Sequence, residues 1–356
     1  MMKIMTPAHN LYIHVPFCIS KCNYCAFFSH PCRTPDWDAY ASAICDEIKS
    51  WRERLGQIVI PTVFFGGGTP SLMPTQTFGQ IMTCIAQNFD IAPGAEITLE
   101  SNPGTLDATR LREFMAHGIN RLSVGVQSLN DDTLRFLGRR HTAADALTLI
   151  DTAHKMGLRT SGDFIYGIPD QTADDVARMC RQINAVGLRH CSMYELTIEP
   201  DTPFEKMNLA MPSNDTMADM YTAIGETLAL PRYEVSNYAA LPDQCRHNAN
   251  IWAGDAYIGL GRGAAGRVII DGIWHDQMGA DLRCAPMTSH DRAVEKIITG
   301  MRTMRGVQLT DDVRTALDWD AVAACADAVT LTPDGFMAPT AKGILILDNL
   351  LVKLIR

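Results

Sequence analysis

Long apolar runs, basic clusters and a secretion signal are all missing from this chain of 356 residues. No apolar stretch approaches the ~20 residues that a membrane-spanning helix needs. Residues 1–10 lack the apolar segment of about 7–15 residues that signal peptides carry. The net charge is −9, the pI is about 5.5, and no basic run is longer than Arg139-Arg140, which argues against a nucleic-acid partner. We therefore expect a cytoplasmic protein without a transmembrane segment.

Disulfides are not expected, although the chain contains 11 cysteines. The cysteine count is odd, and the missing signal peptide indicates a reducing compartment. Eight of the cysteines occur singly and are each interpreted as a small buried apolar residue: Cys32, Cys45, Cys84, Cys180, Cys191, Cys245, Cys284 and Cys325.

Strand-like runs alternate with amphipathic helical stretches over the first 200 residues. The predicted strands are residues 11–17, 62–65, 96–100, 121–126, 160–166 and 191–196. The predicted helices between them are residues 36–54, 75–88, 107–117, 143–156 and 173–186. This alternation predicts an α/β fold of parallel βαβ units, arranged as a barrel or as an open sheet. Polar residues and glycines at the strand ends favour a barrel with its site at the C-terminal face of the strands.

The pattern changes after residue 200. We expect a helix at 215–229, a short strand at 233–238 and a glycine-rich segment at 254–266. Residues 290–356 predict a small, mostly helical domain with a β-like run at 328–331 and a closing helix at 342–354. The expected division of the chain is therefore 1–210, 211–289 and 290–356.

Three cysteines, Cys18, Cys22 and Cys25, follow the first predicted strand in a C-x3-C-x2-C spacing. An ordinary structural zinc or iron–sulfur site takes four protein ligands. Three thiolates on a [4Fe-4S] cluster leave one iron open for a small molecule. A structural zinc site is the alternative, and it would need a fourth ligand such as His14, His30 or Cys32.

A second set of candidate residues lies at the ends of the later strands. Three glycines, Gly66–Gly68, let the backbone approach a ligand closely and offer N–H groups to a carboxylate; an ordinary tight turn is the alternative. Glu100, Gln127 and Asp163 are polar side chains at or in apolar strands, where they are costly without a partner. Together they suit a ribose, an amine or an adenine. Arg139 either binds a ligand carboxylate or ends a solvated helix.

The cysteine spacing and the glycine turn resemble the radical S-adenosylmethionine (SAM) superfamily. Taken in order, the motifs are similar to the oxygen-independent coproporphyrinogen III oxidases and their HemW-type relatives. They are Tyr12-x-His14-x-Pro16-Phe17-Cys18, Phe65-Gly-Gly-Gly-Thr69-Pro70-Ser71, Glu100-x-Asn102-Pro103-Gly104, Val126-Gln127-Ser128, Gly138-Arg139-Arg140-His141 and Asp163-x-Ile165-Tyr166-Gly167-x-Pro169-x-Gln171-Thr172.

This resemblance implies a partial (β/α)6 TIM-like radical SAM barrel with a small C-terminal domain. It also implies a [4Fe-4S] cluster on the three cysteines, with SAM on its open iron. The residues it implies as SAM contacts are Tyr12, Tyr24, Gly67, Gly68, Thr69, Glu100, Gln127, Arg139 and Asp163.

Two differences separate this chain from the oxidases that it resembles. The oxidases carry a further cysteine two residues after the third cluster cysteine, where this chain has Phe27. They also carry a long N-terminal segment, whereas 17 residues precede Cys18 here. Both differences indicate the HemW-type heme chaperones, which imply heme and a heme-acceptor protein as partners. The alternative is a radical SAM enzyme that decarboxylates a porphyrinogen oxidatively, or a radical SAM methyltransferase.

The chaperone branch also carries a His-Asn-x-x-Tyr-Trp motif proposed to engage heme. This chain keeps His247 and Trp252, but Ile251 replaces the tyrosine, and Ala265 replaces a histidine expected farther on. His247 is the candidate heme ligand, since imidazole is a common axial ligand, and Cys245 is a weaker alternative. In the other interpretation His247 only holds its segment against the barrel.

Overall fold

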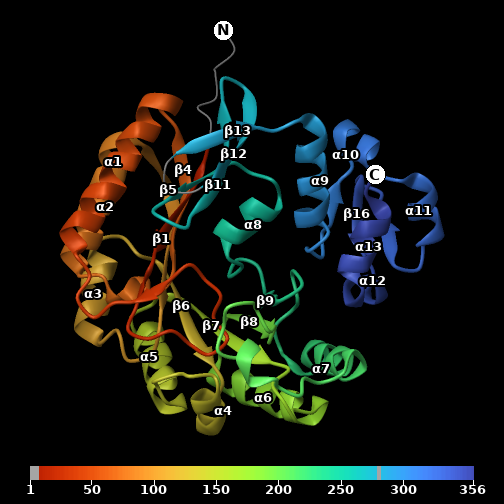
Figure 1. The fold of residues 1–356 in the computed structure, drawn as a ribbon, viewed down its shortest axis with the longest axis horizontal. Coiled ribbons are helices and arrows are strands. Elements are labelled where there is room, and N and C mark those ends of the chain that lie inside the picture. Colours follow the sequence, from red (N-terminus) through yellow and green to blue (C-terminus); the bar gives the residue numbers. More distant parts are fainter. Residues whose placement is uncertain (1–7, 279–281) are drawn as a thin grey trace.

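The structure is a computed structural model that describes residues 8–278 and 282–356. Its main feature is an 11-stranded sheet in the order β13-β12-β11-β10-β1-β4-β5-β6-β7-β8-β9. The six central strands are parallel, and they curve into the partial barrel shown in Figure 1. They are β1 (Asn10–Val15), β4 (Val59–Gly67), β5 (Asp90–Ser101), β6 (Arg121–Gln127), β7 (Arg159–Tyr166) and β8 (His190–Glu195).

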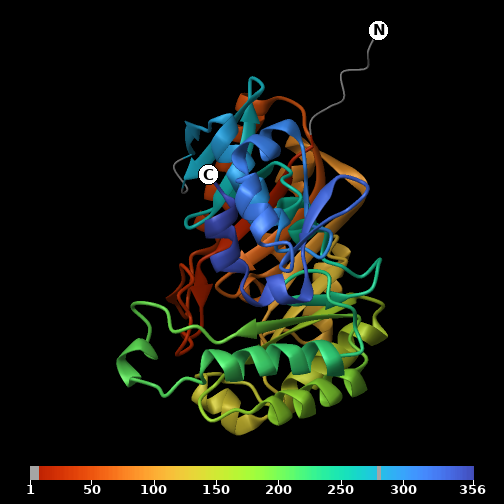
Figure 2. The same ribbon diagram turned by 90° about the vertical axis from the view of Figure 1, so that its right-hand side faces the viewer.

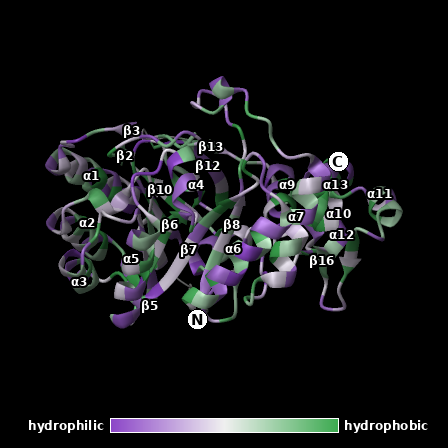
Figure 3. Ribbon diagram, turned by 90° about the horizontal axis from the view of Figure 1, so that it is seen from below, coloured by the Kyte–Doolittle hydropathy of each residue, from purple (hydrophilic) through white to green (hydrophobic). Residues whose placement is uncertain are grey.

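Helices cover the outer face of this sheet, on the left and below in Figure 1. They carry hydrophobic and hydrophilic residues in alternation along their length (Figure 3), as helices with one buried face do. Thr142 and Thr172 begin two of them with capping boxes, which satisfy free N–H groups of the first turn. The helices are α1 (Trp37–Leu55), α2 (Thr75–Asn88), α3 (Ala108–Ala116), α4 (Asp131–Phe136), α5 (Ala143–Lys155), α6 (Ala173–Val186) and α7 (Asn214–Thr227).

The chain then returns into the barrel and extends its sheet. Helix α8 (Arg246–Trp252) lies on the concave side of the strands (Figure 1). Strand β10 pairs with β1 in parallel, β11 to β13 continue the sheet antiparallel, and β9 pairs with β8. Their bounds are β9 (Asn237–Ala239), β10 (Tyr257–Leu260), β11 (Ala265–Ile270), β12 (Ile273–Met278) and β13 (Arg283–Pro286).

The last part of the chain has its own hydrophobic core, formed by residues between Ala293 and Leu354. It lies beside the barrel on the side away from α1–α3 (Figures 1 and 2). The elements are α9 (Ser289–Gly300), β14 (Val307–Gln308), α10 (Asp311–Ala316), α11 (Trp319–Ala324), β15 (Val329–Leu331), β16 (Phe336–Pro339), α12 (Ala341–Leu345) and α13 (Leu347–Leu354). The predicted domain boundaries at 210 and 289 stay predictions.

Two predicted elements are wrong in detail. The closing helix predicted at 342–354 is two helices, because Ile346 leaves the helical conformation between them at φ −124° and ψ 25°. The strand predicted at 233–238 is reduced to β9, because the chain turns at Glu234, whose carboxylate accepts from Ser236 N at 2.7 Å. Within the described residues, no helix combines the length and apolar character needed to cross a membrane.

Candidate functional site

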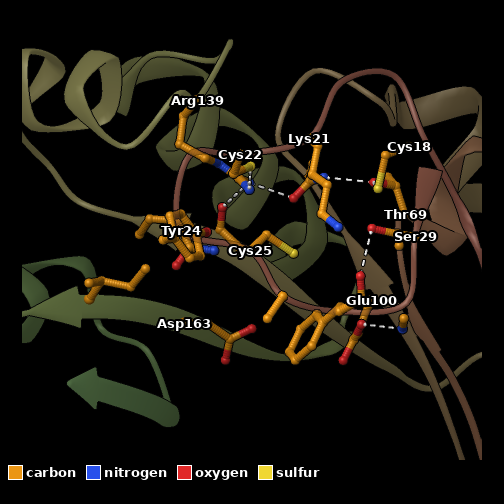
Figure 4. A pocket seen from close by; sticks show the side chains of 18 of the residues that line it. Cys18, Lys21, Cys22, Tyr24, Cys25, Ser29, Thr69, Glu100, Arg139 and Asp163 are labelled. Atoms are coloured by element: carbon orange, nitrogen blue, oxygen red, sulfur yellow. Dashed lines mark hydrogen bonds between the residues drawn. The ribbon is translucent and has the colours of Figure 1, made fainter. Parts of the chain in front are cut away.

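The three cysteines lie on one loop at the C-terminal end of β1. Cys18 ends the short strand β2 (Phe17–Cys18), which pairs with β3 (His30–Pro31). The loop is held by main-chain hydrogen bonds from Gly68 N to Val15 O and from Thr69 N to Phe17 O, both 2.8 Å. All three thiols line one cavity of about 460 Å³ at the top of the barrel (Figure 4). Local sequence thus places the cysteines at the end of the barrel where active sites occur.

The thiols have the surroundings of iron–sulfur ligands. Thr69 Oγ1 donates to Cys18 Sγ at 3.5 Å, and Arg139 Nη1 donates to Cys22 Sγ at 3.4 Å. Burial raises the pKa of the Cys25 thiol, and the Cys22 and Cys18 thiols raise it further. Hydrogen bonds to the sulfurs and burial are the means by which proteins tune such clusters. The donor set therefore fits a [4Fe-4S] cluster with three protein ligands.

The zinc alternative gains no support from His14, one of its three candidate fourth ligands. His14 contacts Tyr12 Oη with Nδ1 at 3.0 Å and Phe28 O with Nε2 at 2.7 Å, so both ring nitrogens are engaged. In the described part of the chain, no group of three or more His, Cys, Asp or Glu side chains is arranged around a single metal ion.

A glycine turn at the end of β4 faces the cysteine loop. Gly67 has φ +109°, a left-handed conformation that favours glycine, and a Cβ there would lie 2.6 Å from the His14 ring. A Cβ on Gly68 would lie 2.7 Å from Phe17 O and 3.0 Å from Cys18 Sγ. Both positions leave no room for a side chain, so the backbone itself forms this wall of the cavity.

Two partly buried carboxyl groups face the same cavity from β5 and β7. Glu100 Oε2 accepts from Gly67 N at 3.2 Å, and Asp163 Oδ2 accepts from Ser123 Oγ at 2.8 Å. Burial, with the neighbouring Asp163 carboxylate, raises the pKa of Glu100 to about 8. Burial also raises the pKa of Asp163. These groups can accept hydrogen bonds from a ligand's hydroxyl or amino groups once they are ionised.

Arg139 connects the cysteine loop to the strand ends. Its Nη2 donates to Gly125 O at 2.9 Å and to the Asn102 amide oxygen, while its Nη1 reaches Cys22. Asn102 in turn donates to Thr69 Oγ1 at 2.9 Å. The sequence assigned no separate role to Asn102, although it lies in the quoted Glu100-x-Asn102 motif. Asn102 therefore connects Thr69, which donates to Cys18, with Arg139, which donates to Cys22.

The structure brings together nearly all the predicted site residues. The residues that line the cavity are Cys18, Cys22, Tyr24, Cys25, Gly67, Gly68, Thr69, Glu100, Gln127, Arg139 and Asp163. Gln127 has φ +65°, an uncommon conformation outside glycine that often marks functional sites. Tyr12 is the exception: it lies behind the glycine turn, where its ring would be 2.9 Å from a Cβ on Gly66.

His247 does not line the cavity and lies below it, beside the middle of strands β4 and β5. It is 2% exposed, and its Nδ1 contacts Thr62 Oγ1 at 2.7 Å. Its backbone N donates to Glu96 Oε1 at 3.0 Å, and its ring stacks on Phe64 at 5.0 Å. Thr62 and Glu96 lie before the C-terminal ends of β4 and β5, below the cavity. These contacts support the interpretation in which His247 holds its segment against the barrel, and heme ligation by this residue gains no support.

We expect His247→Ala to destabilise the protein without changing the spectrum of added heme. The substitution removes a buried ring and leaves the Thr62 hydroxyl without this partner, which typically costs about 2–4 kcal/mol of unfolding free energy. Chemical denaturation measures the first effect and the Soret band measures the second. A shifted Soret band with unchanged stability would restore the axial-ligand role.

Known proteins share both the motifs and the fold of this chain. The model of the radical SAM superfamily matches residues 12–183. The heme chaperone HemW of Haemophilus influenzae is 36% identical over 74% of this chain and 71% of the relative. HemW of Escherichia coli is 35% identical over the same shares.

Among solved structures, the coproporphyrinogen III oxidase HemN of Escherichia coli superposes with a TM-score of 0.81. It is 22% identical in sequence, and the superposition covers 98% of this chain and 90% of HemN. At that identity the likeness shows the fold: a radical SAM barrel followed by a mostly helical C-terminal part. With the sequence identity to the chaperones, it establishes that this chain belongs to the HemW family of the radical SAM superfamily.

Proposed function

We propose that the protein is a heme chaperone that binds a [4Fe-4S] cluster, SAM and heme, and passes heme to an acceptor protein. The observation that carries this proposal is the identity to the HemW chaperones over about three quarters of the chain. Phe27 supports it, because this exposed phenylalanine occupies the position where the oxidases of the resembled family carry a cysteine. The 11 free cysteines support a cytoplasmic location.

The residues of the cavity have separable roles in this proposal. Cys18, Cys22 and Cys25 would hold the cluster, which would supply an open iron for SAM and an electron for its reduction. The backbone of Gly67 and Gly68 can come close to the methionine part of SAM, because successive N–H groups in a turn can bind an anion such as its carboxylate. The other predicted contacts surround the rest of the molecule: Tyr24, Thr69, Glu100, Gln127, Arg139 and Asp163. Tyr12 does not line the cavity; its role in this proposal is to hold His14 and the glycine turn in place.

Heme transfer tests the proposal directly. The anaerobically reconstituted protein is loaded with heme, separated from free heme and mixed with a heme-free globin. We expect the Soret band to move to that of the globin faster than it does from heme on serum albumin. Failure of the protein to retain heme through the separation would contradict the proposed function.

SAM affinity should depend on pH through Glu100. The free protein carries this carboxyl with a pKa of about 8, whereas a SAM hydroxyl or amino donor binds the ionised form. Below pH 8 binding must therefore expel a proton, and affinity should fall by about tenfold per pH unit; above pH 8 it should level off. Isothermal titration between pH 6 and 9 measures this profile. A Glu100→Gln variant should show weaker binding with the slope removed, and a persistent slope would exclude Glu100 as its source.

A further inference from the structure

The outer surface of the cysteine loop carries exposed aromatic side chains. Phe27 is 66% exposed and lies on the rim of the cavity, and the next residue, Phe28, is 45% exposed. Large aromatic rings are costly to leave in water, and exposed apolar patches commonly mark interaction sites. The SAM site accounts for the cavity below this surface, but it gives no reason for rings on its outside.

Phe28 is also the point where the glycine-rich segment meets the cysteine loop. A Cβ on Gly263 would lie 2.5 Å from Phe28 Cδ1, so this glycine packs directly on the ring. The adjacent Arg262 is exposed, and its Cζ lies 5.4 Å from the centre of the Phe28 ring. In the described part of the chain Arg262 has no ion-pair partner. The guanidinium thus lies over the Phe28 ring, and its N–H groups can still bind an anion.

An exposed imidazole lies close to this face. His30 begins β3, and its backbone N donates to Pro16 O at 2.9 Å, which fixes its main chain. Its ring packs edge-on against Phe17 with the centroids 5.2 Å apart. No hydrogen bond to either ring nitrogen occurs within residues 8–278 and 282–356. The Cα atoms of residues two apart are at most about 7 Å from one another, so the main chain of His30 lies within the width of a porphyrin ring from that of Phe28.

We propose that heme docks on this surface, defined by Phe27, Phe28, His30 and Arg262, which we name the loop face. The flat macrocycle packs on Phe28 with its edge at Phe27, a propionate pairs with Arg262, and His30 ligates the iron. This assignment rests on the proposed heme-chaperone function and gives it a site. Heme matches the loop face in three ways at once: aromatic packing, a carboxylate for the guanidinium, and a metal for the imidazole.

The location has a consequence for how the two cofactors interact. Phe27 and Phe28 of the loop face lie on the same loop as Cys18, Cys22 and Cys25, while Arg262 comes from the glycine-rich segment. Phe28 O is hydrogen-bonded to His14, which also contacts Tyr12 behind the glycine turn. Heme would therefore lie above the cluster cavity, whereas His247 lies below it. The SAM site below and the heme site above would therefore be connected by the short cysteine loop.

Heme titration of single variants tests the loop face, with the cluster absorbance as a check on folding. We expect Phe28→Ala to raise the heme dissociation constant at least tenfold, and His30→Ala to change the Soret spectrum of bound heme. Arg262→Gln should weaken heme binding severalfold while leaving binding of the heme dimethyl ester unchanged, because the ester has no carboxylate. The matched controls are exposed residues elsewhere, Leu331→Ala, His290→Ala and Arg178→Gln, which should behave like the parent protein.

The outcomes separate this site from the function that it serves. If the parent protein binds heme and the loop-face variants bind it with unchanged affinity and spectrum, the loop face is wrong and the chaperone function stands. If the parent protein binds no heme, both proposals fall. Equal losses in the loop-face variants and in the controls would indicate general destabilisation and would also overturn the assignment.

Discussion

Replacement of Cys22 by alanine is expected to abolish the brown iron–sulfur absorbance and, with it, SAM binding. The loop supplies three thiols to one cavity, so removal of one leaves two ligands for a cluster that needs three protein thiolates besides its open iron. Cys22 also accepts the hydrogen bond from Arg139 Nη1. Its loss therefore frees the guanidinium that ties the loop to Asn102 and Gly125. The expected change is a fall in bound iron and sulfide from near four per chain to near zero.

The control for this prediction is Cys325→Ala, a cysteine that packs against the core of the C-terminal part. It should retain the full cluster content, because it is remote from the cavity. Iron and labile-sulfide analysis after anaerobic reconstitution measures both variants. A complete cluster in Cys22→Ala would overturn the three-thiolate site, and zinc without labile sulfide in the parent protein would establish the rival metal.

Replacement of Gly67 by alanine should weaken SAM binding by a factor of about 100 while sparing the fold. The residue has φ +109°, which costs a non-glycine residue of the order of 1–3 kcal/mol. The added methyl group would also lie 2.6 Å from the His14 ring, so His14 must move. Because His14 holds both Tyr12 and Phe28 O, that movement disturbs the cavity wall. Loss of about 2.7 kcal/mol of binding energy corresponds to this factor.

Gly94→Ala is a matched control for this substitution. Gly94 also has a positive φ, +72°, but no atom lies within 4 Å of the position of its Cβ. Both variants therefore place an alanine at a positive φ, but only in Gly67→Ala does the added methyl group collide with a neighbouring side chain, that of His14. Isothermal titration with SAM should separate them, with Gly94→Ala close to the parent protein. Equal affinities in the two variants would show that the glycine turn does not form the SAM site.

The parts of the site that depend on local sequence were predictable. The C-x3-C-x2-C spacing confines three thiols to one loop, and parallel strands bring their C-terminal ends to one edge of the sheet. Glu100, Gln127 and Asp163 therefore face the same cavity, although they are far apart in the chain. The supporting residue Asn102 was hidden, because its role depends on contacts with Thr69 and Arg139 from two other segments.

The position of His247 could not be predicted, because a motif does not show how deep in the barrel a returning segment lies. The segment reaches the middle of β5, where Glu96 accepts from His247 N and forms an ion pair with Arg159 at 3.1 Å. Arg121, which is 1% exposed, donates to Asp243 O in the same layer at 2.9 Å. These polar partners were visible in the sequence only as isolated charged residues in strands. Tyr12 likewise lies behind the glycine turn rather than in the cavity.

One experiment separates heme delivery from catalysis on a porphyrinogen. The anaerobically reconstituted protein, with SAM and a reductant, is supplied with heme in one vessel and with coproporphyrinogen III in another. Heme binding is followed by absorbance, and the porphyrinogen products are analysed by mass spectrometry. We expect tight heme binding that survives gel filtration, and coproporphyrinogen III recovered without loss of carbon dioxide. Decarboxylated porphyrinogen together with no retained heme would contradict the chaperone function and identify the protein as an oxidase.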